Sequence, residues 1–92
     1  MRWRRALADA ARVAWSVTRN IQWLLIGGPH DGETLWIKQG SRVAYDGTVY
    51  QGQNYLHGGR LYRVGFVDPN DLEPSKVARL IRETELAHIA GS

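Results

Sequence analysis

The sequence predicts a single small α+β domain, in which an antiparallel β-meander of about three to five strands lies between an N-terminal and a C-terminal helix. Apolar residues recur at three- and four-residue spacing near both ends of the chain, whereas the middle holds short apolar runs separated by turn residues. A length of 92 residues fits one domain. We therefore expect a basic amphipathic helix in residues 1–19, an antiparallel sheet in residues 21–67 and a helix in residues 71–90.

Composition excludes several classes of site and of protein. The chain has no cysteine, which rules out disulfides, thiolate zinc sites and cysteine nucleophiles. No apolar run approaches the ~18 residues that a membrane-spanning helix needs. The N-terminus is basic like that of a signal peptide, but Asp9, Arg12 and Arg19 interrupt its apolar residues. We therefore expect a cytoplasmic protein without a membrane span.

The N-terminal segment has a helical pattern with two stripes. One stripe is apolar and consists of Trp3, Leu7, Ala10, Ala14 and Val17. The other consists of Arg5, Arg12 and Arg19, which are seven residues apart, and Trp15 lies beside it. A surface helix with solvated arginines explains this pattern, as does a docking helix with Trp15 as anchor and the arginines as rim. Binding to a membrane interface is a third, weaker reading, because alanines contribute little buried area.

Charge is concentrated in the same segment. The first nineteen residues hold five arginines against Asp9, whereas the remainder holds seven Lys/Arg against eight Asp/Glu. A basic arm on a nearly neutral body favours an acidic partner, such as nucleic acid, a membrane surface or an acidic protein patch.

The first turn of the predicted sheet lies between the apolar runs 23–26 and 34–37. Its structural residues are Gly27, Gly28, Pro29, Asp31 and Gly32. Pro29 presets φ for a turn, and Gly32 can take the positive φ that closes it. A phosphate-binding loop is not indicated, because no lysine follows the glycines and the next segment has a strand pattern.

The remaining strand candidates follow from turn residues and alternation. Residues 42–45 and 48–50 flank Asp46-Gly47, a strong signal for a tight hairpin. Residues 52–54 suggest a bulge or a break. Residues 55–56 and 60–67 flank a second hairpin. In the last strand Tyr62, Val64 and Phe66 alternate, so that they pack on the core and Arg63 faces out, or the register slips and the faces exchange.

The C-terminal helix is expected to begin after Asp71, a suitable N-cap, with Pro74 in its first turn. Its apolar face contains Val77, Leu80, Ile81, Thr84 and His88. Gly91 stands where a helix C-cap would.

The central half of the chain resembles a family of small proteins of tailed bacteriophages and prophages, most of which have no assigned function. The residues that carry the resemblance are the segment 24–32 (LLIGGPHDG), Tyr55, His57 and the segment 61–64 (LYRV). The resemblance implies a phage or prophage setting, in the host cytoplasm or the virion, rather than an activity. The arginine-rich N-terminal segment is not part of this pattern.

The candidate groups for catalysis or metal binding are few. His30 and His57 lie in glycine-rich turns and His88 lies in the last predicted helix, without the converging ligands that zinc needs. No serine has a nucleophile setting. We therefore predict no catalytic residue, no cofactor and no metal site.

Two classes of function remain. Four tryptophans and four tyrosines exceed what so small a core needs. We therefore expect a non-catalytic protein–protein interaction, as a virion accessory subunit or a host-directed inhibitor, through Arg5, Arg12, Trp15 and Arg19. The alternative is sequence-independent nucleic-acid binding by the same arginines. A homo-oligomer is compatible with either reading.

Overall fold

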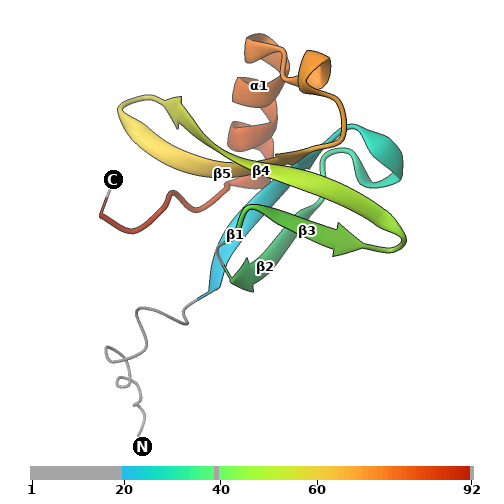
Figure 1. Cartoon of the computed structure of the whole chain (residues 1–92). Helices are drawn as coiled ribbons and strands as arrows, with labels where there is room; N and C mark the ends of the chain where they lie inside the picture. The colour runs from blue at the N-terminus through green and yellow to red at the C-terminus, as the bar shows by residue number, and fades with distance from the viewer. Residues whose placement is uncertain (1–19, 39, 92) are drawn as a thin grey trace, which may run out of the picture.

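The structure is a computed structural model that describes residues 20–38 and 40–91 (Figure 1). Its strands are β1 (Asn20–Ile26), β2 (Thr34–Lys38), β3 (Arg42–Tyr45), β4 (Thr48–His57) and β5 (Arg60–Phe66). Its helical elements are the short 3-10 helices η1 (Gly28–His30) and η2 (Pro69–Asp71) and the α-helix α1 (Pro74–Thr84). The helix predicted for residues 1–19 lies outside the described residues.

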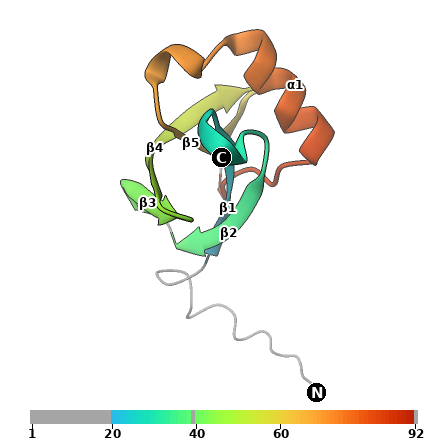
Figure 2. The same ribbon diagram turned by 90° about the vertical axis from the view of Figure 1, so that its right-hand side faces the viewer.

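The five strands form one mixed sheet in the order β2-β1-β5-β4-β3. The pairs β1–β2, β3–β4 and β4–β5 are antiparallel, whereas β1 and β5 are parallel. The sheet curls into a half-barrel with α1 outside the curve (Figure 2). Its two edges are β2 and β3, and α1 covers what we call the outer face; the inner face lines the half-barrel.

The predicted antiparallel meander is therefore wrong. The chain forms one hairpin (β1–β2), then a three-stranded meander (β3–β4–β5), and the last strand of the meander docks beside β1 in the same direction. The sequence does contain a sign of this central position. The run from Trp23 to Ile26 is fully buried, and a continuous apolar run is typical of a strand covered on both faces.

The outer face holds an aliphatic core. Leu24, Ile26 and Val64 pack against the apolar face of α1. The helix and the segment after it contribute Val77, Leu80, Ile81 and Leu86. Burial of each such side chain contributes about 1.5–3 kcal/mol, so this layer holds α1 on the sheet.

The inner face is built around Trp23, whose side chain is fully buried. A Cβ added at Gly52 would lie 2.5 Å from Trp23 Cη2, and one at Gly65 would lie 3.1 Å from Trp23 Cε3. These glycines therefore make room for the indole. The bulge or break predicted at residues 52–54 is wrong, because β4 continues through them and pairs with β5 residue by residue, and Gly52 marks a close approach instead.

Arg63 also lies on the inner face and is only 8% exposed. Its Cζ lies 4.7 Å from the centre of the Trp23 ring, its Nη1 donates to Asn54 Oδ1 at 2.9 Å, and its Nη2 donates to the Gly40 carbonyl. Burial lowers the pKa of the guanidinium below its usual value. Tyr62, Val64 and Phe66 pack on the core under α1, as the first of the two expected registers has them. The outward position expected for Arg63 in that register is wrong, because the opposite face of β5 is covered as well.

The C-terminal helix is shorter than the predicted 71–90. It begins at Pro74 after the N-cap Glu73, while Asp71 belongs to η2. It ends at Thr84 because Glu85 adopts a left-handed conformation (φ 52°) and the Leu86 N–H donates to the Ile81 carbonyl at 3.1 Å. Gly91 therefore caps no helix.

The segment after α1 lies against the sheet. The Ala87 N–H donates to Gln22 Oε1 at 2.8 Å, and the Ile89 N–H donates to the Leu61 carbonyl at 2.7 Å. Within the residues that the structure describes, no helix is long and apolar enough to cross a membrane.

Candidate functional site

The predicted partner-binding residues Arg5, Arg12, Trp15 and Arg19 all lie outside the described residues. Among the described residues, the candidate site consists of edge strand β2, the open side of the half-barrel between β2 and β3, and the β1–β2 loop.

The β1–β2 loop contains the predicted turn residues, from Gly27 to Gly32, with Pro29 inside η1. Gly32 has the predicted positive φ, 88°, and its N–H donates to the Leu25 carbonyl at 2.7 Å. Gly28 also has positive φ (68°), and a Cβ there would lie 3.0 Å from the Tyr50 hydroxyl. The glycines thus let the loop turn sharply while it packs closely on the inner core.

Asp31 fixes this loop from within and ties it to α1. Its Oδ1 accepts the Gly27 N–H at 2.5 Å and lies 3.0 Å from Lys76 Nζ. Partial burial acts to raise the pKa of Asp31, but the Gly27 hydrogen bond and the Lys76 ammonium outweigh it, so the pKa lies below its usual value. The Gly27 N–H, which an anion would need, is therefore already occupied.

His30 joins this loop to the turn between β3 and β4. Its Nδ1 lies 2.7 Å from Glu33 Oε2, and its Nε2 lies 2.9 Å from Asp46 Oδ2. The ring packs on Tyr45 with centres 4.6 Å apart, and the Tyr45 hydroxyl lies 3.5 Å from Glu33 Oε1. Hydrogen bonds to Glu33 and Asp46 raise the pKa of His30 above 6.5.

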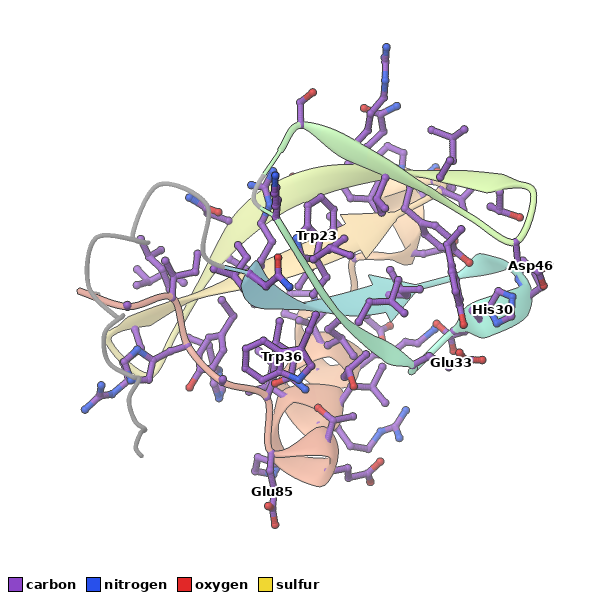
Figure 3. All side chains as sticks on the ribbon, turned by 90° about the horizontal axis from the view of Figure 1, so that it is seen from below. Trp23, His30, Glu33, Trp36, Asp46 and Glu85 are labelled. Atoms are coloured by element: carbon purple, nitrogen blue, oxygen red, sulfur yellow. The ribbon has the colours of Figure 1, made fainter. Side chains whose placement is uncertain are left out.

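Strand β2 presents the largest exposed aromatic side chain of the described residues. Trp36 is at the centre of β2 and is 59% exposed. It pairs with Gln22 and lies on the outer face, where α1 leaves it exposed. Leu35 pairs with Trp23 and lies on the inner face. Figure 3 shows Trp23 and Trp36 on opposite sides of β1. The edge of β2 that does not pair with β1 has no partner strand within the described sheet.

The other two histidines meet at a different place. The rings of His57 and His88 lie 6.1 and 6.4 Å from the ring of Tyr62, and Arg60 Nη1 lies 2.8 Å from His88 Nε2. His88 therefore lies in the segment after α1 rather than on the predicted helical face. Among residues 20–38 and 40–91, no group of three His, Asp or Glu side chains is arranged to hold a metal ion.

Two of these features could not be singled out from sequence. Trp36 sits in a run, TLWIK, whose pattern is that of any strand, and only the strand order makes it an edge residue. Asp46 carries a hairpin signal, which says nothing of its contact with a histidine sixteen residues earlier. For Trp36 the available hint is the number of tryptophans in a short chain.

Comparison with known proteins adds no relative, since the chain matches no protein-family model, no curated protein and no solved structure.

Proposed function

We propose that this chain is a non-catalytic protein-interaction module that docks on a larger protein through the free edge of β2, with Trp36 as its anchor. The observation that carries the proposal is a sheet edge with a solvent-exposed tryptophan at its centre. An edge strand offers unpaired backbone groups to a partner strand, and an aromatic side chain supplies much of the binding energy of an interface.

Strand β2 suits this role better than the other edge, β3. Strand β3 has four residues, and its two exposed positions hold the charged Arg42 and the small Ala44. Short and charged edges resist pairing with other chains. In the part of the chain that the structure describes, the other large exposed apolar residues are Val49, Leu56 and Val67, which lie on or after other strands. Single exposed apolar residues are ordinary, so the combination of edge and tryptophan is what distinguishes β2.

The setting we propose is that of a phage or prophage, in which the module acts as a virion accessory subunit or as an inhibitor of a host protein. The resemblance carried by residues 24–32 supports this setting. In the same proposal, Arg5, Arg12, Trp15 and Arg19 extend the interface with an aromatic anchor and a basic rim.

Site-specific photo-cross-linking in cells that express the chain tests the docking surface. A benzophenone amino acid replaces Trp36 in one variant and Leu56 in a matched control, since Leu56 is a similarly exposed apolar residue (68%) on β4. We expect position 36 to give one discrete protein adduct and position 56 to give none. Adducts from position 56 alone would contradict the proposal.

The partner identified in this way then allows a measurement of affinity. Trp36→Ala is expected to weaken binding by at least ~2 kcal/mol, or roughly thirtyfold, while Leu56→Ala changes it little. An adduct between two copies of the chain would identify the partner as a second copy, which sedimentation of the purified protein would confirm. Equal affinity of Trp36→Ala and wild type would remove Trp36 as anchor.

The second candidate function is sequence-independent binding of nucleic acid by the N-terminal arginines. Its support is the excess of five arginines over one acid in residues 1–19. In that case a plot of the logarithm of the binding constant for duplex DNA against the logarithm of the salt concentration should have a slope of about −0.9 for each phosphate contacted. Replacing Arg5, Arg12 and Arg19 by glutamine should abolish most of this binding, whereas Trp36→Ala should leave it unchanged.

A further inference from the structure

We propose that His30 is a protonation-dependent clasp that ties the two free edges of the half-barrel together at one end. Glu33 immediately precedes β2 and Asp46 immediately follows β3, and His30 contacts both carboxylates (Figure 3). At the other end of the same two strands, the chain itself makes the connection between Lys38 and Arg42. The open side is thus closed covalently at one end and by His30 at the other.

The geometry requires a charged imidazole. A neutral histidine has one N–H donor and one nitrogen that only accepts. Here each ring nitrogen faces a carboxylate oxygen, at 2.7 Å and 2.9 Å, and an ionised carboxylate can only accept. Both hydrogen bonds therefore form together when the ring carries two protons. Loss of one proton sets a nitrogen lone pair against a carboxylate and breaks one half of the clasp.

The groups that face His30 come from three elements. Glu33 leads into β2, Asp46 lies in the β3–β4 turn, and Tyr45 at the end of β3 packs its ring on the imidazole. Among the described residues, the ion pairs of Glu33 and Asp46 are both with His30. Two cations of α1 pair with other carboxylates, Lys76 with Asp31 and Arg79 with Glu83.

The direction of the pH effect follows from this arrangement. The contacts raise the pKa of His30 in the folded chain above its ordinary 6.5. A group with a raised pKa stabilises the fold fully below its unfolded pKa, and the effect is lost as the pH rises through the folded pKa. The clasp is therefore closed in mildly acidic solution and loosens on the alkaline side of 6.5. This inference does not rest on the proposed docking function.

An NMR titration of the three histidines tests the clasp, with His30 assigned by its loss in His30→Gln. We expect His30 to titrate above 6.5, and both Asp46→Asn and Glu33→Gln to lower its pKa. Asparagine tolerates the positive φ of Asp46 (51°), so this variant removes the charge and keeps the turn. His57→Gln is the control, because His57 lies in the other hairpin, and it should leave the His30 pKa unchanged.

Amide exchange gives an independent readout of the loosening. Two amides report on the clasp: that of Thr48, which pairs with Tyr45 where the β3–β4 hairpin closes, and that of Glu33, which donates to the His30 carbonyl at 3.0 Å. Their protection, corrected for intrinsic rates, should fall by about fivefold as His30 deprotonates, a ratio typical of one lost hydrogen bond. His30→Gln should show no such step. The proposal is overturned if His30 titrates at or below 6.5, if neither carboxylate variant moves its pKa, or if protection does not change through the titration. Should one carboxylate variant fail to fold, the other carboxylate variant and the wild-type titration decide the outcome.

Discussion

The two faces of the sheet are filled in different ways. The outer face packs aliphatic side chains such as Leu24 and Val64 under α1, where shape is easily adjusted. The inner face packs a whole indole, Trp23, between Gly52, Gly65 and the guanidinium of Arg63. The first arrangement needs apolar residues of suitable size, while the second needs particular residues at particular positions.

The inner face also holds buried polar atoms whose desolvation costs free energy. Among the described residues, Trp23 Nε1, Tyr50 Oη and Arg63 Nε are buried side-chain atoms without a hydrogen-bond partner. Each such group costs about 1–3 kcal/mol of desolvation. The close packing of the inner face therefore offsets a penalty, and its loss should be felt more strongly than a change of similar size under α1.

The largest expected effect comes from Trp23→Ala, which should destabilise the fold by about 3–5 kcal/mol in denaturant unfolding. The side chain is fully buried, and its removal also leaves Arg63 without the ring on which it stacks. Trp36→Ala is the matched control, because the same residue type is 59% exposed there, and it should change stability by less than ~0.5 kcal/mol. Similar losses for the two variants would refute the assignment of one tryptophan to the core and one to the surface.

A smaller effect is expected from Gly52→Ala, at about 1–3 kcal/mol. The new Cβ would lie 2.5 Å from both Trp23 Cη2 and Arg63 Nη2, so the ring or the guanidinium has to move. Gly40→Ala is the control, because the nearest heavy atom there is 3.9 Å away and the cost should be close to zero. In a Trp23→Phe background the penalty at Gly52 should shrink, and a double-mutant cycle that shows no coupling would contradict the packing described here.

The smallest effect is expected on the outer face. Leu24→Met conserves volume within the aliphatic layer under α1 and should cost less than ~1.5 kcal/mol in the same unfolding assay. Trp23→Phe is the corresponding aromatic exchange on the inner face, and it should cost more because it leaves a void beside the glycines. A larger loss for Leu24→Met than for Trp23→Phe would reverse the contrast between the two faces.

Local features of this fold could be predicted from the sequence. The Asp46-Gly47 turn has positive φ at both residues (51° and 80°), as the hairpin signal indicates, and Gly32 has the positive φ that closes the first turn. The conformation of each turn depends on the backbone preferences of one or two residues, and these preferences follow directly from the residue types.

Features that depend on distant partners could not be predicted in the same way. The parallel pairing of Trp23 with Arg63 joins residues forty positions apart, and no local pattern specifies it. The burial of Arg63 follows from that pairing. The end of α1 at Glu85 could not be predicted for a different reason, since a non-glycine residue takes the left-handed position for which glycine is the usual signal.

The site shows the same division. Sequence identified the turn that holds His30 but could not bring Asp46 to it, because that contact depends on the curl of the sheet. The number of tryptophans indicates that some lie at the surface, but the sequence does not show which of Trp23 and Trp36 is buried, since both lie in apolar strands. The strand order alone makes one of them central and the other an edge residue.

Amide exchange along β2, measured for the free chain and for its complex with the protein cross-linked through position 36, tests the central claim most directly. In the free chain, the amides of β2 that point away from β1 should exchange rapidly, because they face the open edge. In the complex these same amides should become protected, while those of β3 do not change. Unchanged exchange along β2, with new protection on β3 or on α1, would contradict docking at this edge.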